Sequence, residues 1–311
     1  MKKWLLLFIT ALLLVACSDE QAVNEDGKPI IKIGYLPTTH AGPLYFMEDT
    51  AEYDVELVRF STWIDLMDAL NAGRVDGASV LIELAMKAHE KGIDLQAVAL
   101  GHEDGNIVTV APHIQETADL IGETIAIPNR YSTHHIYVHQ MLEQAGYSID
   151  DVNLVEMAPA EMPSALSENR IAGYVVAEPF GSIGVSLGVG KVLYQSQEIW
   201  PHSIDCALVL RTAFIERDEA LTTAFVQQYA QAGLDAHAKD EHALTQINAF
   251  LKLQDNVLAQ SLEWISYEHL AIPEDAYTVL RQAMMDLELS ENPPTFEDFV
   301  NNSYLVNEVT Q

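Results

Sequence analysis

The segment ALNAGRVDGASV at residues 69–80 decides the fold, because a second segment, ALSENRIAGYVV at residues 165–176, repeats its pattern. Each segment has the features of a helix end, a turn and a buried strand. Helix stop signals recur for physical reasons alone, so the likeness has an ordinary explanation. The alternative is that the chain builds two similar α/β lobes that face each other. Five residue pairs coincide at one constant offset: Ala69/Ala165, Leu70/Leu166, Arg74/Arg170, Gly77/Gly173 and Val80/Val176.

Around both segments, short β-branched runs alternate with helical patterns. This order predicts mostly parallel sheets with helices on both faces. Strands are expected at residues 29–37, 53–60, 75–82, 95–101, 106–112, 124–128, 152–159, 171–179, 191–196 and 206–215. From Asp218 onward the pattern is mostly helical, and we expect these helices to complete the first lobe.

We therefore expect a two-lobed α/β protein with two doubly wound sheets and a cleft between them. The first part of lobe 1 covers residues 29–111, and lobe 2 covers residues 112–205. Residues 206–311 return to lobe 1 and end in helices. The chain would leave the first lobe along residues 106–112 and return along residues 205–212.

The first 16 residues have the pattern of a signal peptide. Two lysines precede the apolar run WLLLFITALLLVA, which is shorter than the ~20 residues of a membrane span. The run ends in LVAC at residues 14–17, which resembles the bacterial lipoprotein cleavage box and implies cleavage before Cys17 and its lipidation. The alternative is an ordinary secretory peptide with an incidental cysteine. Residues 17–28 are small, polar and acidic, which is typical of a flexible tether.

The chain is strongly acidic, with a formal net charge of −30 at pH 7. Nucleic-acid binding needs basic patches, so this composition argues against it. It also disfavours extended contact with anionic lipid headgroups. Attachment to a membrane would then rest on the lipid at Cys17.

Polar residues follow several predicted strands at the positions where open parallel sheets bind ligands. Helix N-termini also point there, so hydroxyl and N–H groups can hold an anion or a polar group without a bulky cation. Each such residue has an ordinary alternative, which is to cap a helix or make a turn. Several polar strand ends facing one cleft favour a binding site. The candidate ligand-binding residues are Thr38, Thr39, His40, Ser79, Val80, His102, Tyr131, Ser132, Thr133, His134 and Glu178.

A metal site is a second interpretation of the segment PNRYSTHHIYVHQML at residues 128–142. His135 and His139 lie four residues apart, which places two imidazoles on one face of a helix. A zinc site needs three or four converging ligands, and this pair supplies two at most. His134 would face another direction. We therefore predict no metal ligands, and expect His135 and His139 to be packing or surface residues.

Signals for catalysis are weak. No phosphate-binding glycine loop with a following Lys-Ser/Thr and no HExxH occurs. Apart from Cys17, the chain has one cysteine, Cys206, within the apolar run DCALVLR, where packing is its ordinary role. We expect a binding protein with neither enzymatic activity nor a cofactor.

Several motifs together resemble those of a known family. The chain is similar to substrate-binding lipoproteins of ABC importers in the nitrate/sulfonate/taurine group and its thiamine-pyrimidine relatives. The resemblance covers about residues 30–215. It is carried by IKIGYLPTTHAGPLYF at 31–46, LMDALNAGRVDGASVL at 66–81, YSTHHIYVHQMLEQAG at 131–146, MAPAEMPSALSENRIAGYVVAEPFG at 157–181 and GVGKVLYQSQEIWP at 188–201.

The resemblance implies a type II periplasmic-binding-protein fold, with ligand contacts from residues 38–40 and 79–80 in lobe 1. From lobe 2 it implies contacts from residues 131–133 and Glu178. It further implies an extracytoplasmic, lipid-anchored monomer that closes on a small solute and delivers it to an ABC permease and its ATPase. The segment LPTTHAG at residues 36–42 departs from both the nitrate and the pyrimidine patterns, so the solute stays open. A metal-binding lipoprotein and a pyrimidine-synthase-like enzyme are the alternatives.

Overall fold

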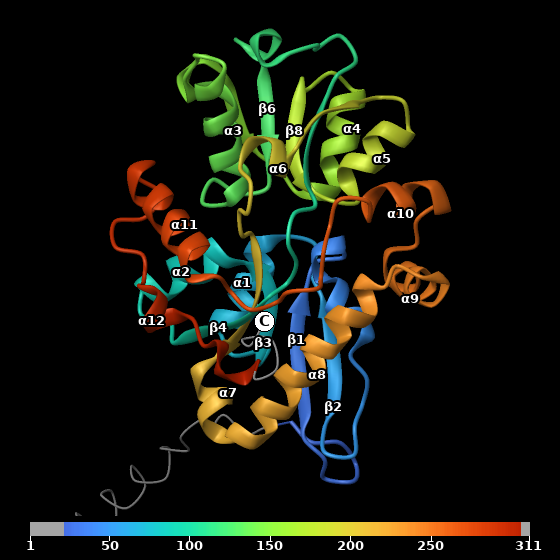
Figure 1. Ribbon diagram of the computed structural model, residues 1–311, viewed down its shortest axis with the longest axis vertical. Helices are drawn as coiled ribbons and strands as arrows, with labels where there is room; N and C mark the ends of the chain where they lie inside the picture. The colour runs from blue at the N-terminus through green and yellow to red at the C-terminus, as the bar shows by residue number, and fades with distance from the viewer. Residues whose placement is uncertain (1–21, 306–311) are drawn as a thin grey trace, which may run out of the picture.

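The structure is a computed structural model that describes residues 22–305. It has two lobes, one above the other in Figure 1, and each contains a five-stranded sheet. The two-lobed α/β fold predicted from the sequence is confirmed. Within residues 22–305, no helix combines the length and the apolar character that crossing a membrane would need.

Lobe 1 is built from both ends of the chain. Its first part contains β1 (Ile30–Tyr35), the 3-10 helix η1 (Thr39–Phe46), β2 (Asp54–Arg59), α1 (Trp63–Asn71), β3 (Gly77–Leu81), α2 (Ile82–Glu90) and β4 (Leu95–Leu100). The chain returns to it with β10 (Cys206–Arg211), which lies between β3 and β4 in the strand order β2-β1-β3-β10-β4.

Lobe 2 lies between these two parts in sequence. It contains β5 (Asn106–Val110), η2 (Thr117–Leu120), β6 (Thr124–Ile127), α3 (Thr133–Gln144), η3 (Ile149–Asp151), β7 (Asn153–Glu156), η4 (Pro159–Glu161), α4 (Met162–Ser167), β8 (Gly173–Ala177), α5 (Phe180–Ser186), β9 (Lys191–Gln195) and α6 (Ser196–Ile199). Its strand order, β7-β6-β8-β5-β9, has the same form as that of lobe 1.

The two similar sequence segments occupy equivalent places in the two sheets. β3 and β8 are both central strands, each between a parallel neighbour and an antiparallel one. A Cβ atom at Gly77 would lie 2.7 Å from the Val209 carbonyl oxygen, and one at Gly173 would lie 3.2 Å from the Thr109 carbonyl oxygen. The shared glycine therefore lets the antiparallel neighbour approach closely.

Two expectations about the sheets need correction. The sheets are mixed, because β10 and β5 run antiparallel to both of their neighbours. β5 also belongs to lobe 2, although residues 106–111 were assigned to lobe 1. Its pairing with β8 and β9 moves the first crossing between lobes to residues 101–105, and the second crossing is residues 200–205, after α6.

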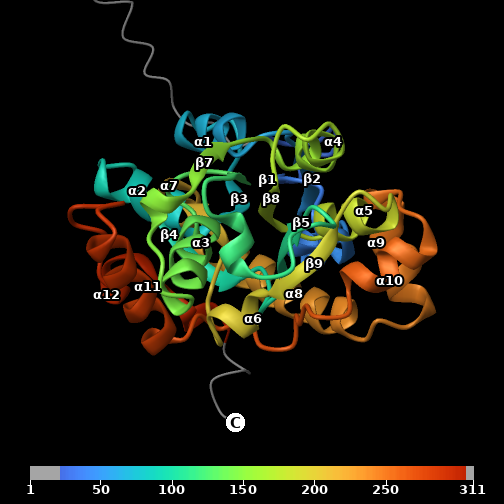
Figure 2. The ribbon, with the colours of Figure 1, turned by 90° about the horizontal axis from the view of Figure 1, so that it is seen from above.

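The C-terminal helices cover lobe 1 and reach toward lobe 2. They are α7 (Thr212–Arg217), α8 (Glu219–His237), α9 (Glu241–Leu251), α10 (Asp255–Ser261), α11 (Glu274–Asp286), α12 (Phe296–Phe299) and η5 (Asn302–Tyr304). Seen from above, α11 and α12 lie on one side of the molecule and α9 and α10 on the other (Figure 2). Phe225, Tyr229 and Tyr277 from these helices are buried in the same core as β1 and β3.

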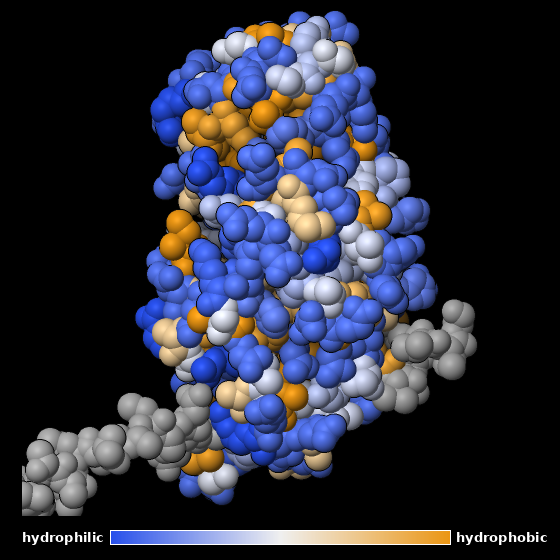
Figure 3. Space-filling view, turned by 90° about the vertical axis from the view of Figure 1, so that its left-hand side faces the viewer, coloured by the Kyte–Doolittle hydropathy of each residue, from blue (hydrophilic) through white to orange (hydrophobic). Residues whose placement is uncertain are grey.

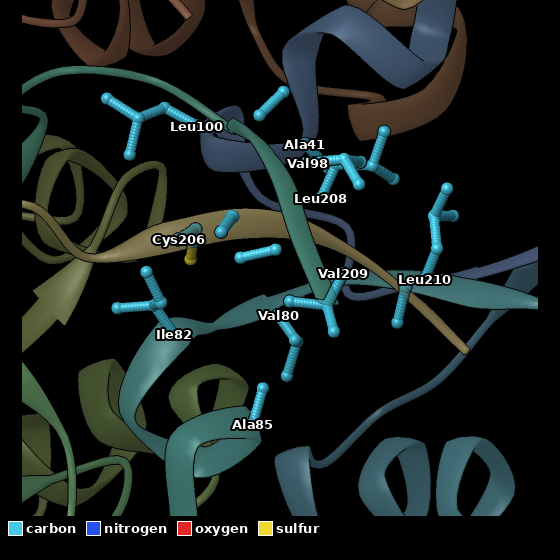
Figure 4. Packing of buried hydrophobic residues seen from close by; sticks show 14 of the residues in the cluster. Ala41, Val80, Ile82, Ala85, Val98, Leu100, Cys206, Leu208, Val209 and Leu210 are labelled. Carbon is cyan, nitrogen blue, oxygen red and sulfur yellow. The ribbon is translucent and has the colours of Figure 1, made fainter. Parts of the chain in front are cut away.

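The centre of that core lies around β10. Cys206, Leu208 and Leu210 on β10 pack with Val80 and Val98 from the flanking strands (Figure 4). The outer surface is different, since the face in Figure 3 is mostly hydrophilic. A polar surface of high net charge keeps such a protein soluble but says little about its ligand.

Cys17 and the signal peptide lie outside the described residues, as does the start of the predicted tether. In the described part of the tether, residues 22–28 form a turn rather than a free linker. Asn24 hydrogen-bonds Asp54 in β2 at 2.7 Å, and Lys28 makes an ion pair with the same carboxylate. These contacts with the start of β2 explain why residues 22–28 form a turn instead of the predicted flexible tether.

Glu90, at the end of α2, ties that helix to the C-terminal segment. It pairs with Lys87 at 2.7 Å and accepts hydrogen bonds from the Ser290 hydroxyl and the Asn292 N–H. Burial alone would raise its pKa, but Lys87 and these hydrogen bonds lower the pKa of Glu90 to about 2. The carboxylate therefore stabilises the fold above the unfolded pKa of about 4.3, and this contribution falls away as the pH drops toward 2.

We expect Glu90→Gln to lower the free energy of unfolding at pH 7 by about 1–3 kcal/mol, since charge-assisted hydrogen bonds are lost. Urea denaturation at pH 7 and at lower pH would measure it. The difference between wild type and variant should shrink between about pH 4.3 and 2. A difference that stays constant with pH would contradict the role of the carboxylate charge.

Candidate functional site

Three histidines and an aspartate meet between the two lobes, where both crossings pass. His40 lies in η1, His102 follows β4, His134 is in the first turn of α3, and Asp205 precedes β10. All four side chains are buried, with no more than 2% of each exposed. Each lobe and each crossing thus contributes one residue to what we call the His/Asp cluster.

Asp205 is at the centre of this cluster. Its Oδ2 lies 3.1 Å from His40 Nδ1 and 3.9 Å from His102 Nε2, and its Oδ1 lies 4.0 Å from His134 Nδ1. The Asn106 amide donates a hydrogen bond to Oδ2 at 3.0 Å. The carboxylate is therefore held from one side by Asn106 and faced by three imidazoles.

The other ring nitrogens of two histidines are fixed by backbone carbonyls. His40 Nε2 lies 3.1 Å from the Gly105 carbonyl oxygen, and His102 Nδ1 lies 2.6 Å from that of Asp104. A carbonyl can only accept, so these two nitrogens carry protons. The His40 and His102 rings lie against each other with 3.6 Å between centroids and a tilt of 34° between their planes.

Burial and charge set the protonation states. Burial lowers the pKa of the His134 imidazole to about 4, and burial together with His40 lowers the pKa of His102 well below its usual range. Burial alone would raise the pKa of Asp205, but the histidines around it hold that pKa well below its usual range. The site at neutral pH thus combines a carboxylate with neutral imidazoles at positions 102 and 134.

Hydrogen bonds join the lobes beside the cluster. The Thr133 hydroxyl, in lobe 2, donates to the Glu83 carboxyl group in lobe 1 and lies 3.2 Å from the Ile204 carbonyl oxygen. The Thr39 N–H and hydroxyl both donate to the Glu178 carbonyl oxygen, at 2.9 and 3.0 Å. Burial, and then the Asp205 charge, raises the pKa of Glu83 well above its usual range.

The structure brings the side chains of five predicted ligand residues to the cluster or to these lobe contacts: Thr39, His40, His102, Thr133 and His134. The Thr38 carbonyl accepts a hydrogen bond from Tyr45, and the Ser132 hydroxyl donates locally to the Asn129 carbonyl. Val80 lies in the hydrophobic core, and Ser79 pairs with Leu208 in the sheet.

Two further predicted residues, Tyr131 and Glu178, have other contacts. Tyr131 is half-buried below the Lys87 ammonium group, 5.6 Å from its ring centroid. The Glu178 carboxylate accepts hydrogen bonds from the Ser182 N–H and hydroxyl, so it holds the start of α5 while its carbonyl bonds Thr39. Ligand contact by these two residues stays a prediction.

Sequence reasoning missed Glu83 and Asp205, and it did not include Asn106 or Cys206 among the candidate ligand residues. The Cys206 thiol lies 3.5 Å from His40 Nδ1, although burial was its only expected role. No sequence signal marked Asp205: ligands bind at the carboxyl ends of parallel strands, whereas Asp205 precedes β10 and reaches that edge only because β10 runs antiparallel to β3 and β4. His135 and His139 lie half-buried on another face of α3, with ring centroids 5.4 Å apart.

We expect Thr133→Val to lower the free energy of unfolding by about 1–3 kcal/mol, because the buried Glu83 carboxyl group loses its hydrogen-bond donor. The lobes should also close less tightly, which small-angle X-ray scattering would detect as a larger radius of gyration. Ser132→Ala is the matched control, since its hydrogen bond stays within lobe 2. Equal expansion of both variants would contradict a lobe-joining role for Thr133.

Comparisons with known proteins match this architecture. A model of the NMT1-like family matches residues 24–247, well over half of the chain. The ligand-binding component of an ABC-type import system from Staphylococcus aureus, solved with zinc bound, is 39% identical. Its TM-score is 0.85, and the match covers 90% of this chain and 98% of that one. The nitrate-binding protein NrtA of Synechocystis shares the fold with a TM-score of 0.79 at 14% identity, over 90% of this chain and 88% of that one.

Among curated proteins, the nitrate import ATP-binding protein NrtC of Synechocystis is 25% identical over 262 residues. That match covers 76% of this chain and 39% of the relative. The chain thus spans less than half of the length of this curated relative. A putative aliphatic sulfonates-binding protein of Escherichia coli is 21% identical, with 68% of this chain and 67% of the relative covered.

Proposed function

The chain belongs to the NMT1-like family, and on that basis we propose that it is the extracytoplasmic solute-binding component of an ABC importer. One observation carries this proposal: buried polar side chains from both lobes and both crossings converge between the two sheets. A site divided in this way is complete only when the lobes are together. Binding of a solute would then stabilise the closed form that a permease and its ATPase receive.

The proposed mechanism is binding and closure without bond-making. The lobes rotate about residues 101–105 and 200–205, and the hydrogen bonds from Thr39 and Thr133 form as they close. Thr38, Ser79, Val80, Tyr131, Ser132 and Glu178 surround the position of the solute in this proposal. We further propose that the protein acts as a monomer, with residues 29–100 and 206–305 in lobe 1.

The class of solute has two sources of support. The names of relatives indicate nitrate, sulfonates and taurine, which favours a small polar or anionic solute, with thiamine-pyrimidine-like molecules as a further candidate. The S. aureus structure indicates zinc. Both classes belong in one panel of ligands.

A thermal-shift panel of nitrate, bicarbonate, alkanesulfonates, taurine, pyrimidines and divalent metals tests the proposal. A ligand at 100 times its Kd stabilises the folded state by about 2.7 kcal/mol, which corresponds to several degrees for a chain of this size. We expect at least one member of the panel to give such a shift. A panel without any response would contradict the proposed function.

We also propose that the mature protein is held at the membrane by a lipid on Cys17. The acidic composition leaves this lipid as the main contact with the membrane. In a bacterial host, Cys17→Ser should move the protein from the membrane fraction to the soluble extracytoplasmic fraction, and labelling with radioactive palmitate should disappear. Retention of the variant in the membrane fraction would contradict the lipid anchor.

A further inference from the structure

We propose that His40, His102, His134 and Asp205 bind a divalent transition metal ion, with Zn²⁺ the best fit, and that this ion is the solute which the lobes capture. The inference rests on the proposed function, because it names the solute of the same site. The proposed site does not include His135 and His139. Its support comes from hydrogen-bond chemistry, distances, burial and the origin of each side chain.

The first argument concerns lone pairs. His102 Nδ1–H donates a hydrogen bond to the Asp104 carbonyl, so in the neutral imidazole Nε2 has a lone pair. That nitrogen has no hydrogen-bond partner, and it faces the Asp205 carboxylate at 3.9 Å. In His40, the Gly105 carbonyl holds Nε2–H, so Nδ1, 3.1 Å from that carboxylate, is the nitrogen that would bind an ion. A cation between these nitrogens and the carboxylate would pair with all of them.

The second argument concerns distances. Zinc binds imidazole nitrogen at about 2.0–2.1 Å in tetrahedral geometry, which separates neighbouring ligand atoms by about 3.3 Å. The three histidine nitrogens lie 3.1, 3.9 and 4.0 Å from the Asp205 oxygens. Ligand atoms of His40, His102, Asp205 and Cys206 all lie within 4.8 Å of one another, which leaves room for an ion but not for a sulfonate or a pyrimidine. His134 lies outside this group, with Nδ1 4.0 Å from Asp205 Oδ1, so it would move inward to complete the proposed ligand set.

The third argument concerns unpaired buried atoms. Both ring nitrogens of His134 and Asp205 Oδ1 are buried without a hydrogen-bond partner. A buried polar group without a partner costs about 1–3 kcal/mol, so such atoms are unusual unless they have a function. One ion at the centre of the cluster would pair with His134, Asp205 and His102 together.

The hydrogen bonds around the cluster are of the kind that orient ligand side chains in metal sites. Ligating histidines characteristically donate the other ring N–H to a carbonyl, and ligating carboxylates are themselves hydrogen-bonded. Here Gly105 and Asp104 supply the carbonyls, and the Asn106 amide holds Asp205. These contacts fix the direction of two imidazoles and of the carboxylate before any ion binds.

The choice of ion follows from the ligand set. Three imidazoles and one carboxylate suit Zn²⁺ and related transition metals, while Ca²⁺ and Mg²⁺ prefer oxygen ligands. The Cys206 thiol, 3.5 Å from His40 Nδ1, is the other candidate for the fourth position. We assign that position to His134, because both of its ring nitrogens are buried without a hydrogen-bond partner and Nδ1 faces Asp205 Oδ1 at 4.0 Å.

The ligand residues come from both lobes and both crossings, which favours an ion that is transported over one that is permanently bound. His40 comes from lobe 1, His134 comes from lobe 2, and the other two ligands lie on the crossings. Separation of the lobes would divide the ligand set. Capture and release of the ion are thus coupled to closing and opening.

The test uses the full-length chain, purified in detergent and stripped with EDTA. Equilibrium dialysis with elemental analysis should give one Zn²⁺ per chain, and X-ray absorption should show nitrogen and oxygen ligands at about 2.0–2.1 Å. Zn²⁺ should raise the melting temperature, and Ca²⁺ at the same concentration should not. Less than one Zn²⁺ per chain, or sulfur in its coordination shell, would overturn this ligand set.

His134→Leu is the decisive variant. We expect it to weaken Zn²⁺ binding more than about 100-fold, since even the loss of a supporting contact costs about 10–100-fold. Its melting temperature in EDTA should be no lower than that of the wild type, because two unpaired buried nitrogens are removed. His134→Gln serves as a second variant if the leucine variant does not fold, and should weaken binding to a similar extent.

The matched control is the double variant His135→Ala, His139→Ala on the same helix. It should bind Zn²⁺ within about two-fold of the wild type. Equal losses in the control and in His134→Leu would overturn the assignment of the site. If an anion from the panel stabilises the chain and Zn²⁺ does not bind, the metal inference fails while the proposed function stands. If no ligand binds, both fail.

Discussion

Asp205→Ala should abolish ligand-dependent stabilisation and lower the free energy of unfolding by about 2–5 kcal/mol. The buried carboxylate accepts hydrogen bonds from Asn106 and contacts His40 at 3.1 Å, and both groups lose their partner in the variant. Each unpaired buried donor costs about 1–3 kcal/mol. Urea denaturation and the thermal-shift panel, each in the presence and absence of Zn²⁺, would measure the two effects.

The contrast with His134→Leu makes this prediction specific. Asp205 Oδ2 has partners in the protein, whereas the His134 nitrogens have none, so loss of Asp205 should destabilise and loss of His134 should not. Asp205→Asn is the control for size, because its amide oxygen can still accept from Asn106. It should recover part of the stability and little of the ligand binding. Full ligand binding by Asp205→Ala would show that the site lies elsewhere.

The sequence predicted the repeated unit but not the direction of the crossing strands. Helix, turn and strand signals are local, so the match of residues 69–80 with residues 165–176 was visible without a structure. The direction of β5 and β10 depends on which strands lie beside them after the chain has crossed. An apolar run such as NIVTV at residues 106–110 reads the same in either direction.

The histidines of the cluster were predicted as ligand residues facing one cleft, but the aspartate that they surround was not. His40, His102 and His134 follow strands or begin helices, and such positions can be identified from sequence. Asp205 and Glu83 are only two of 46 acidic residues, and sequence alone does not distinguish them from solvated ones. Their burial depends on the return of the chain between β3 and β4, which is a long-range feature.

Tyr267→Ala should give the largest loss of stability in the C-terminal region, about 3–5 kcal/mol. The side chain is fully buried, and its ring packs so closely on η1 that a Cβ atom at Gly42 would lie 2.6 Å from it. Its hydroxyl donates to the Thr39 carbonyl oxygen at 2.6 Å. Removing a large aromatic side chain leaves a cavity, and the 3-10 helix that carries His40 would lose its support.

Affinity should fall along with stability, since His40 and the lobe contact of Thr39 depend on the position of η1. Tyr267→Phe separates the loss of the ring from the loss of the hydrogen bond. It keeps the ring but leaves the Thr39 carbonyl without its donor, so the free energy of unfolding should fall by about 1–2 kcal/mol. Tyr229→Phe is the matched control, because the Tyr229 hydroxyl is buried without a partner and its removal should be neutral or stabilising. Urea denaturation of the three variants would measure these changes in the free energy of unfolding. If Tyr229→Phe cost as much as Tyr267→Phe, the Thr39 hydrogen bond would have no special role in holding η1.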